Sequence, residues 1–546
     1  MAGRALILLC LLFVIPTARP PLLETLTLEQ RVGQMFMVSL YGPELTEVGR
    51  DFLRRWQPGA LALFGSNAGA PEDVTALTNA FQHTITDAGG LPLLIAVDQE
   101  GGLIAHLRDG FTEFPAPMLV TATGDPELAY AFGEAIGQEL RAVGITMNLA
   151  PVADLETNPD NPIIRRRSFG SDPHLTAPMI AAVVRGLQDA GVLATLKHFP
   201  GHGDTSADSH VALPVIRHSR ERLHSVELIP FQAGIAVRAE AVMVAHIWYP
   251  ALELQENLPA TLSHEVVTGL LREDLGFDGL IMTDALAMDA IDTAFSYEDA
   301  AVMAVQAGVD VLAFGTNAGL QTQGQAIQAV VDAVRAGLIS EERINTSVQR
   351  ILDVKARYGI LEWQPLDVAG ASERVNREAH EALVETLFRA GVTVVYDDRG
   401  VLPLSDASSL AFVYPATRTQ VARECEVYHA GIDWVGVSGS PQDEEIAWAR
   451  SAARSADTVV VFTQNAVDDV QQQALVRALP PEKTIVVALW SPYDWTAFPD
   501  ISGYVTTYSP LRPAVPAACA VLFGAIPAQG QLPIALSPDL PAGIHQ

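Results

Sequence analysis

The stretch VLATLKHFPGHGDTSADSH, residues 192–210, begins as an apolar strand and continues as a polar loop. Its first five residues are apolar or β-branched, which is typical of a buried strand. The loop holds one lysine, three histidines and two aspartates, together with two glycines and one proline. A hydrophobic core does not require so many titratable groups side by side. The stretch therefore predicts a strand whose carboxyl end carries the loop of an active site.

Eight short apolar runs occur between residues 26 and 360, and most are separated by amphipathic helical patterns. The predicted strands are Gly33–Leu40, Gly59–Phe64, Leu91–Val97, Ile145–Val152, Val192–Leu196, Ala241–Ala245, Gly279–Met282 and Val309–Phe314. Alternating strands and helices imply an α/β fold with a parallel sheet. Eight repeats favour an N-terminal (β/α)8 TIM-type barrel over residues 24–358. The alternative is an open doubly wound sheet, but no GxGxxG motif opens a helix after the first strand.

The barrel prediction has a test within the sequence, because catalytic side chains of such barrels lie at the carboxyl ends of the strands. Titratable side chains do follow five consecutive predicted strands: Asp98, Asp154, the pair Lys197 and His198, His246, and Asp284. Packing alone does not explain this repetition. These residues therefore predict one pocket at that end of the barrel.

A second domain follows the barrel. Residues 359–390 are predicted as a linker and a connecting helix, with one long helix over Ser372–Ala390. The alternation of strands and helices resumes over residues 391–546, which predicts a smaller α/β sandwich with a mainly parallel sheet. Its strands are predicted at Gly391–Tyr396, Ser409–Tyr414, Asp433–Val437, Thr458–Thr463, Thr484–Leu489 and Gly503–Thr507.

The composition narrows the range of partners. The chain has 546 residues, too many for one hydrophobic core, and a formal net charge of −30. Little positive charge is available to neutralise phosphates, which argues against nucleic acid and against docking on anionic lipid. No obligatory protein partner is expected.

Three cysteines are present, Cys10, Cys425 and Cys519. Cys10 lies within the N-terminal apolar run, so a mature chain can form at most one disulfide, and no four-cysteine zinc site. We expect Cys425 and Cys519 to be free buried thiols.

Residues 1–20, MAGRALILLCLLFVIPTARP, place one arginine before about a dozen apolar residues, followed by Pro16 and small residues. This pattern is typical of a secretory signal peptide, and the apolar run is short for a membrane-spanning helix. An uncleaved N-terminal anchor is the alternative. Both possibilities predict an extracytoplasmic chain, either secreted or membrane-anchored, whose only membrane contact is this segment.

Asp284 and the pair Asp208 and His210 are the candidate catalytic groups. A carboxylate at a strand end can attack an electrophilic carbon or hold a cation, although Asp284 could also cap a helix. An aspartate two residues before a histidine can orient the imidazole, which exchanges protons near neutral pH. The alternative for this pair is a solvated polar loop.

Two further possibilities concern binding. Arg167 has a planar guanidinium that can hold a hydroxyl pair or a carboxylate, and Asp98 stands beside the bare backbone of Gly101 and Gly102. The alternative for the arginine is a solvated basic patch, and the alternative for Asp98 is an aspartate that only stabilises a turn.

A zinc site in the loop is a third possibility, but the spacing matches no short zinc pattern and a nearby lysine opposes a cation. Its ligands would be His198, His202, Asp204, Asp208 and His210.

The loop KHFPGHGDT at 197–205, followed by DSH at 208–210, closely resembles the signature of family 3 glycoside hydrolases, in the two-domain β-N-acetylglucosaminidase branch. MTDALAM at 282–288 resembles that family's nucleophile segment. VDQEGG at 97–102, RSFGSD at 167–172 and VMVAHIWYP at 242–250 are similar to its barrel segments, and LFGAIPAQGQLP at 522–533 to the end of its second domain. The resemblance covers nearly the whole chain after the N-terminal segment.

The resemblance implies a role for each candidate residue. Asp284 would be the nucleophile of a retaining mechanism, and His210 the general acid and then base, with Asp208 as its partner. The sugar hydroxyls would be bound by Asp98, Arg167, Lys197 and His198, and His246 would line the same pocket. No metal and no cofactor are expected. β-Glucosidases that resemble this family take a carboxylate from the second domain instead, so here residues 391–546 would be structural or a binding module.

The implied function is an exo-β-N-acetylglucosaminidase that removes terminal GlcNAc from an oligosaccharide or glycopeptide, such as a peptidoglycan or chitin fragment. A histidine repels an anion less than a carboxylate does, so phosphate could replace water, and a phosphorylase is an alternative on the same site. A broader β-glycosidase is another. A non-catalytic sugar-binding protein and a metal-dependent hydrolase are alternatives of different functional classes.

Overall fold

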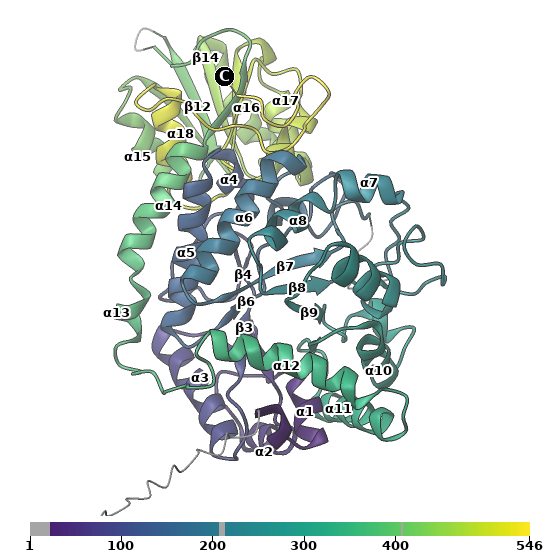
Figure 1. Ribbon diagram of the computed structural model, residues 1–546. Helices are drawn as coiled ribbons and strands as arrows, with labels where there is room; N and C mark the ends of the chain where they lie inside the picture. The colour runs from purple at the N-terminus through teal and green to yellow at the C-terminus, as the bar shows by residue number, and fades with distance from the viewer. Residues whose placement is uncertain (1–21, 207–212, 406–407, 546) are drawn as a thin grey trace, which may run out of the picture.

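The structure is a computed structural model that describes residues 22–206, 213–405 and 408–545. It consists of two α/β parts, with the second part stacked on one side of the first (Figure 1). The predicted N-terminal segment at residues 1–20 and the candidate catalytic residues Asp208 and His210 lie outside the described residues. Within the described ranges, no helix combines the length and apolar character needed to cross a membrane.

The first part is the predicted parallel barrel. Its eight strands follow one another around the sheet in the order β10-β1-β2-β3-β6-β7-β8-β9, and every pairing is parallel. An isolated parallel bridge between Met282 and Val311 joins the two ends of this order. The sheet therefore closes, and the open doubly wound alternative is wrong. The strands are β1 (Phe36–Ser39), β2 (Ala60–Leu63), β3 (Leu94–Val97), β6 (Met147–Asn148), β7 (Leu193–Phe199), β8 (Ala241–Val244), β9 (Leu280–Thr283) and β10 (Leu312–Ala313).

Helices cover the outside of the barrel (Figure 1). Several begin at a side-chain cap: the carboxylate of Asp172, for example, accepts the N–H groups of His174 and Leu175 at the start of α6. The helices are α1 (Leu28–Gln34), α2 (Glu47–Trp56), α3 (Pro71–Thr86), α4 (Pro117–Ala122), α5 (Pro126–Ala142), α6 (Pro173–Asp189), α7 (Arg220–Ser225), α8 (Ile229–Ala236), a π-helix (Glu265–Asp274), α9 (Asp289–Asp292), α10 (Tyr297–Ala307), α11 (Leu320–Arg335) and α12 (Glu341–Arg357).

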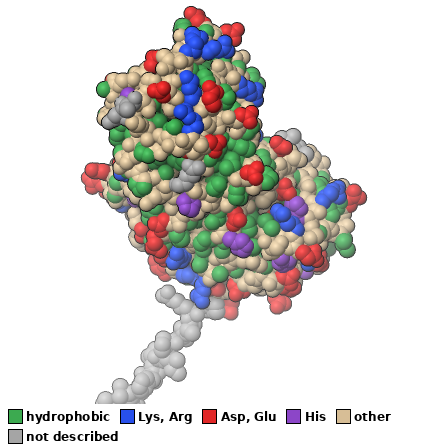
Figure 2. Space-filling model, turned by 90° about the horizontal axis from the view of Figure 1, so that it is seen from above, with side chains coloured by type: hydrophobic (Ala, Val, Ile, Leu, Met, Phe, Trp, Pro, Cys, Tyr) green, Lys and Arg blue, Asp and Glu red, His purple; other side chains and the backbone are tan. Residues whose placement is uncertain are grey.

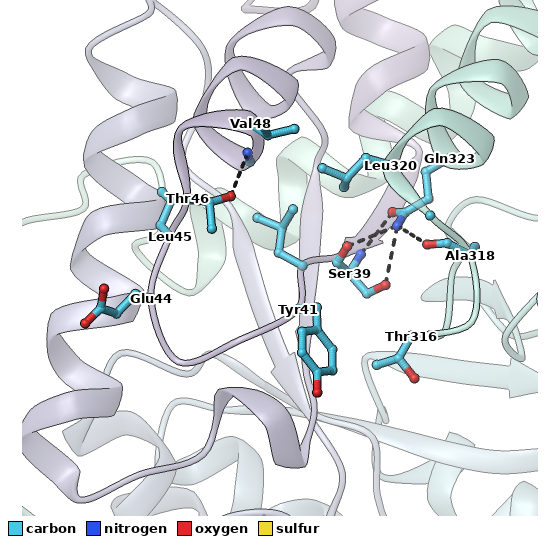
Figure 3. Close-up of a pocket in the computed structure, with 13 residues that line it drawn as sticks. Ser39, Tyr41, Glu44, Leu45, Thr46, Val48, Thr316, Ala318, Leu320 and Gln323 are labelled. Atoms are coloured by element: carbon cyan, nitrogen blue, oxygen red, sulfur yellow. Dashed lines mark hydrogen bonds between the residues drawn. The ribbon is translucent and has the colours of Figure 1, made fainter.

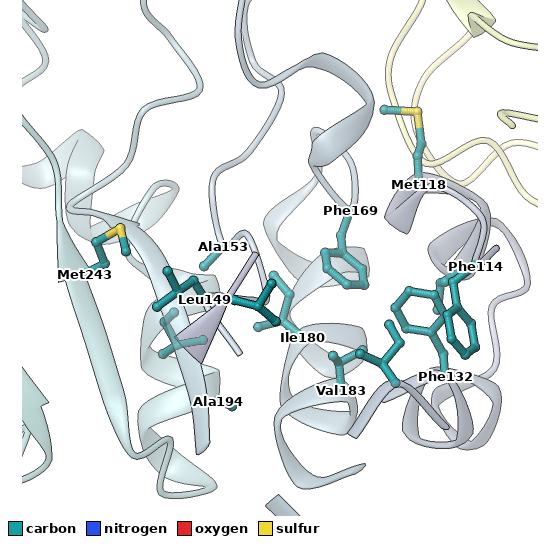
Figure 4. Packing of buried hydrophobic residues seen from close by; sticks show 14 of the residues in the cluster. Phe114, Met118, Phe132, Leu149, Ala153, Phe169, Ile180, Val183, Ala194 and Met243 are labelled. Atoms are coloured by element: carbon teal, nitrogen blue, oxygen red, sulfur yellow. The ribbon is translucent and has the colours of Figure 1, made fainter. Parts of the chain in front are cut away.

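Helices α5 and α6 approach each other closely through glycines. A Cβ on Gly133 would lie 2.4 Å from the Val183 carbonyl oxygen, and a Cβ on Gly186 would lie 2.2 Å from the Tyr130 carbonyl oxygen. Aromatic and aliphatic side chains fill the core beside this contact (Figure 4), and the rings of Phe114 and Phe132 meet edge to face at 5.7 Å. Helix α6 of this pair also packs on β7.

The second part has a six-stranded sheet in the order β11-β16-β15-β14-β12-β13, in which only the β11–β16 pairing is antiparallel. The predicted mainly parallel sheet is therefore confirmed. Its strands are β11 (Thr393–Asp397), β12 (Leu410–Pro415), β13 (Ile432–Val437), β14 (Thr458–Thr463), β15 (Thr484–Ala488) and β16 (Gly503–Thr506). Its helices are α15 (Gln420–Glu426), α16 (Asp443–Ser455), α17 (Val470–Arg477) and α18 (Ala514–Leu522).

The connection between the two parts differs from the predicted single helix. It contains two helices, α13 (Ala371–Val375) and α14 (Arg377–Gly391), which run up the side of the barrel to the second part (Figure 1). Asn376 separates them with a φ of 54°, in the left-handed region that asparagine tolerates better than most residues. The chain changes direction at this residue, between α13, which packs on α3 and α5, and α14, which packs on α4, α5 and α18.

The expectation of two free thiols is wrong. Cys425 in α15 and Cys519 in α18 form a disulfide, with their Cα atoms 5.1 Å apart. The two residues are 94 positions apart in the sequence, and the packing of α15 against α18 brings them together. Both side chains are fully buried.

Candidate active site

A cavity of about 370 Å³ opens at the carboxyl ends of the barrel strands. Five predicted site residues line it: Asp98, Arg167, Lys197, His198 and Asp284. They come from β7 and from the segments that follow β3, β6 and β9. The structure therefore brings together residues that are up to 186 positions apart in the sequence, counted from 98 to 284.

A buried network of charges forms one side of the cavity. The Arg167 guanidinium donates two hydrogen bonds to the Glu100 carboxylate, from Nε to Oε2 at 2.9 Å and from Nη2 to Oε1 at 2.8 Å. The Lys197 ammonium lies 2.5 Å from Asp98 Oδ1 and 2.7 Å from Glu100 Oε1. Arg167 is presented by a short 3-10 helix, Arg165–Arg167, and Glu100 by the hairpin strand β4 (Gln99–Gly101), which pairs with β5 (Ile104–Ala105).

The network keeps Glu100 and Lys197 charged. Burial raises the pKa of Glu100, but Arg167 and Lys197 outweigh this effect and lower the pKa to about 2. Burial lowers the pKa of Lys197, but Asp98 and Glu100 outweigh it, so that the pKa lies above its usual value. Fixed charges of both signs can donate to and accept from the hydroxyls of a sugar at the same time.

Asp154 organises the two histidines that follow β7. Its carboxylate accepts the backbone N–H of His198 at 3.1 Å and that of His202 at 2.6 Å, and it contacts Nδ1 of the His198 ring at 2.7 Å. Burial raises the pKa of Asp154 to about 6 and holds the pKa of His198 well below its usual value. A neutral His198 therefore carries its proton on Nδ1 toward Asp154, and Nε2 is the acceptor that it can offer to a sugar hydroxyl.

Asp284 follows β9 and is partly exposed to the cavity. One carboxylate oxygen accepts the N–H of Ala285 at 2.7 Å. Burial raises the pKa of this carboxyl, but neighbouring groups outweigh burial and lower the pKa below its usual value; they are His198, His246, the Ala285 N–H and Lys197. The carboxylate is therefore ionised near neutral pH and can act as a nucleophile.

His246 is placed behind Asp284 and is fully buried, so it is not among the residues that line the cavity. Its Nδ1 contacts Thr261 Oγ1 at 2.7 Å, and its Nε2 lies 3.0 Å from the Ala285 carbonyl oxygen. Because a carbonyl only accepts, Nε2 donates this hydrogen bond. His246 thus supports the segment that carries Asp284.

The loop that contains the predicted dyad is described up to Ser206. Its first half is held in place: Asn161 Nδ2 donates to the carbonyl oxygens of His202 at 2.9 Å and Gly203 at 3.0 Å. Asp204 turns away to His218, with Oδ2 2.5 Å from Nε2. Among the described residues, no group of three or more His, Cys, Asp and Glu side chains is arranged to share a metal ion.

Sequence reasoning gave no role to several residues that the structure places in the site. The sequence predicts Asp154 only as one of the strand-end residues of the pocket. It does not predict Glu100, although Glu100 lies two positions after Asp98, a spacing that can place both side chains on one face of an extended segment. The sequence does not show the hydrogen-bond partners of either carboxylate. His106 also lines the cavity, against the Phe64 ring at 5.9 Å, because the β4–β5 hairpin folds back there. Nothing in the sequence indicates that His106 lies in the cavity.

An ionised carboxylate beside side chains that can hydrogen-bond the hydroxyls of a sugar, at the mouth of a (β/α)8 barrel, is an arrangement that suits a carbohydrate-active enzyme. A family model described as "Glycosyl hydrolase family 3 N terminal domain" matches residues 27–354. The chain therefore belongs to glycosyl hydrolase family 3, which confirms the family predicted from the sequence, and it is a glycoside hydrolase.

The relatives span nearly the whole chain. Beta-hexosaminidase A of Pseudoalteromonas piscicida is 32% identical and covers 91% of this chain and 91% of its own length. The beta-N-acetylglucosaminidase/beta-glucosidase of Cellulomonas fimi is 27% identical and covers 93% of each. A solved family 3 beta-N-acetylglucosaminidase from Paenibacillus sp. str. FPU-7 is 37% identical with a TM-score of 0.82, over 94% of this chain and 99% of that chain.

Proposed function

We propose that this glycoside hydrolase is a retaining exo-β-N-acetylglucosaminidase that releases terminal β-linked GlcNAc from peptidoglycan or chitin fragments. The observation that carries the proposal is the shared cavity: the carboxylate of Asp284 opens into the same space as the hydroxyl-binding Asp98 and Lys197. Full-length relatives that bear the names β-hexosaminidase and β-N-acetylglucosaminidase support the choice of sugar.

The proposed reaction has two steps. The Asp284 carboxylate attacks C1 of the terminal sugar, and His210, oriented by Asp208, gives its proton to the departing glycosidic oxygen. His210 then takes a proton from water, which attacks C1 and releases the sugar from Asp284. Two carboxylates are usual in retaining enzymes, and here a histidine replaces the second one. Asp98, Arg167, Lys197 and His198 hold the sugar hydroxyls during both steps.

The charges around the cavity balance at the step in which the acceptor attacks. Asp284 is then bound to the sugar, and two carboxylates, Asp98 and Glu100, face two cations, Arg167 and Lys197. Water is the proposed acceptor, and phosphate is the acceptor that a phosphorylase would use. A broader β-glycosidase is the second candidate, because the relative from Cellulomonas fimi bears both activities in its name.

The test compares an aryl β-GlcNAc with an aryl β-glucoside, in the wild-type protein and in Asp284→Ala. We expect a preference for the GlcNAc substrate and a loss of at least about 1,000-fold in kcat in the variant, because the nucleophile is removed. Equal rates in wild type and variant would refute the role of Asp284 and favour a non-catalytic sugar-binding protein. A preference for the glucoside would establish the broader glycosidase instead.

Two additions to this assay distinguish hydrolysis from phosphorolysis and from metal-dependent hydrolysis. Activity in phosphate buffer should release free GlcNAc, and release of GlcNAc 1-phosphate would establish a phosphorylase. Treatment with a chelator should leave the rate unchanged, since the proposed steps use no metal. Loss of activity with the chelator would favour the metal-dependent hydrolase.

An extracytoplasmic location, secreted or anchored, is part of the proposal and rests on the composition of residues 1–20. N-terminal sequencing of the protein recovered outside the cytoplasm tests it. A new N-terminus near residue 20 indicates a cleaved signal, an intact N-terminus in the membrane fraction indicates an anchor, and recovery only from the cytoplasm contradicts both.

A further inference from the structure

Three consecutive arginines, Arg165, Arg166 and Arg167, form the short 3-10 helix that follows β6 at the carboxyl end of the barrel. Arg167 lines the active-site cavity, whereas Arg165 and Arg166 do not. Cations in such a run are usually solvated. Here the first two arginines contact the second domain instead. We call residues 165–171 the arginine segment.

The side chains of the first two arginines are held by the second domain. Arg165 Nη1 lies 2.9 Å from Asp468 Oδ2, and Arg165 Nε donates to the Asn161 carbonyl oxygen of the barrel at 3.0 Å. The Arg166 guanidinium stacks on the ring of Trp490, with Cζ 4.4 Å from the ring centroid. Asp468 and Trp490 thus contact the arginine segment on the side of Arg167 that precedes it in the sequence.

The second domain also holds the residues that follow Arg167. The N–H of Ser171 donates to the Pro533 carbonyl oxygen at 3.0 Å, and the Ser171 hydroxyl accepts the N–H of Ala535 at 3.0 Å. Gly170 approaches the same segment so closely that a Cβ on it would lie 2.3 Å from the Pro533 carbonyl oxygen. The second domain therefore contacts the chain on both sides of Arg167.

The backbone at Arg165 needs such support. Its φ is 39°, in the left-handed region that a residue with a Cβ adopts only at an energetic cost. Conformations of this kind persist where surrounding contacts fix them. Because Arg165 lies two residues before Arg167, the direction of the chain at Arg165 determines where the Arg167 guanidinium can reach Glu100 and the cavity.

Other segments at this end of the barrel are held by the barrel itself. Gln323 of α11 accepts the N–H of Ser39 at 3.1 Å through Oε1, and its Nε2 donates to the carbonyl oxygens of Ser39 at 3.0 Å and Ala318 at 2.8 Å (Figure 3). The Ser39 hydroxyl donates to the Gly315 carbonyl oxygen at 2.9 Å. These hydrogen bonds join the end of β1 to the segment after β10. The arginine segment differs, because the second domain supplies contacts to it.

We propose that Trp490 and Asp468 of the second domain are positioning residues, which hold the arginine segment so that Arg167 meets the hydroxyls of the terminal sugar. The second domain then acts on the substrate through Arg167, without a side chain of its own in contact with the sugar. The inference rests on the proposed function, because it takes a terminal GlcNAc as the ligand of Arg167.

Trp490 provides the stronger of the two contacts. The side chains of Arg165 and Asp468 are 39% and 47% exposed, and ion pairs with such exposure stabilise a structure little. The Nε atom of Arg166 is buried, and burial lowers the pKa of this guanidinium to about 10. A desolvated guanidinium gains more from an aromatic ring than an exposed one does. The test therefore uses Trp490.

A double-mutant cycle measures whether Trp490 acts through Arg167. The substrate is an aryl β-GlcNAc with an activated leaving group, so that the weaker variants remain measurable. Trp490→Ala should lower kcat/KM about tenfold in the wild-type background, because the arginine segment loses its aromatic contact. In the Arg167→Ala background the same substitution should change kcat/KM by less than about twofold, because the group it positions is absent. Trp490→Phe keeps a ring and should retain most of the activity.

Trp448→Ala is the matched control, since this tryptophan lies on α16 of the same domain and is 52% exposed. It should leave kcat/KM unchanged. Trp490→Leu keeps an apolar side chain without the aromatic ring, and it replaces Trp490→Ala in the cycle if that variant does not fold.

Equal losses in the two backgrounds would overturn the inference, because Trp490 would then act on the fold in general, and so would no loss in the wild-type background. Failure of the wild-type protein to cleave the aryl β-GlcNAc is a different result. It would refute the proposed function, whereas an active wild type with equal losses refutes only the positioning role.

Discussion

At the scale of single residues, Asp154 determines how the histidines after β7 face the cavity. One buried carboxylate accepts hydrogen bonds from two backbone N–H groups and from one imidazole. It therefore fixes both the position of the His198 ring and the nitrogen that carries the proton. Asp154 does not line the active-site cavity, and its contact with the cavity is through the His198 ring, which does line it.

Asp154→Asn should lower kcat/KM for an aryl β-GlcNAc by about 100-fold, because an amide cannot accept all three hydrogen bonds and the His198 ring shifts. Steady-state kinetics across a pH series measure this effect. Asp204→Asn is the matched control, since this aspartate lies on the loop after β7, next to the segment that holds the two histidines, but pairs with His218. Activity in Asp154→Asn equal to that of the control would contradict the positioning role.

Some site residues could be predicted from the sequence and others could not, for a physical reason. Asp98, Lys197 and Asp284 come directly after apolar runs or end them, and the geometry of a barrel brings such strand ends together. The importance of Glu100 arises from two cations that belong to distant segments, and a single sequence does not show such partners. The predicted roles of Asp208 and His210 remain predictions, because these residues lie outside the described part of the chain.

At the scale of elements, the contact between α5 and α6 depends on the absence of side chains. Gly186 sits inside α6, where alanine would normally be the better helix former by roughly 1 kcal/mol. Here a Cβ would lie 2.2 Å from the Tyr130 carbonyl oxygen and 2.6 Å from the Glu134 nitrogen, both of which belong to the backbone of α5. The two helices would have to move apart.

Gly186→Ala should therefore lower the free energy of unfolding by about 1–3 kcal/mol, which chemical denaturation measures. Gly269→Ala is the control, because this glycine is also helical but its nearest neighbour, a flexible Glu265 carboxylate, would lie 3.7 Å from the new Cβ. That substitution should be neutral or stabilising. A stabilising Gly186→Ala would show that the two helices are not closely packed.

The strands could be predicted more reliably than the connecting helices. Buried parallel strands are continuous apolar runs, and every predicted run of both sheets corresponds to an observed strand. No glycine or proline at position 376 indicates that the helix ends there. The break lies between α13, which packs on α3 and α5, and α14, which packs on α4, α5 and α18, and these contacts are properties of the folded chain. The Cys425–Cys519 pairing was missed for the same reason.

At the scale of the whole molecule, the second domain supports the loop that carries Arg167. Arg165 pairs with Asp468 at 2.9 Å, and the Arg166 guanidinium stacks 4.4 Å above the Trp490 ring. The second domain thus contributes to the site through contacts with the barrel, and its described residues do not line the active-site cavity.

The face shown in Figure 2 has small groups of Lys and Arg between Asp and Glu, with no continuous basic surface among the described residues on that face.

Glu156 lies buried near the interface between the two domains and neither of its carboxylate oxygens has a hydrogen-bond partner. Burial raises its pKa to about 8, against the opposing effect of Arg165. The unfolded chain releases this proton near pH 4.3, so between about pH 4.3 and 8 the folded state binds more protons than the unfolded state. The contribution of Glu156 to the free energy of unfolding therefore falls as the pH rises from about 4.3 to about 8.

Glu156→Gln removes this titration. The difference in melting temperature, variant minus wild type, should increase steadily from pH 5 to pH 8, because only the wild type loses stability through this group. Thermal unfolding at several pH values measures the difference and cancels the titration of all other groups. A difference that stays constant over this range would contradict the raised pKa.

The most direct test of the central claim is the mass of the protein after reaction with a slow substrate, a 5-fluorinated β-GlcNAc fluoride, followed by peptide mapping. We predict one added sugar per chain, attached to Asp284 in the peptide that contains residues 282–288, and no adduct in Asp284→Ala. An adduct on another residue, or turnover of this reagent without any covalent intermediate in the wild-type protein, would contradict the assignment of Asp284 as the nucleophile.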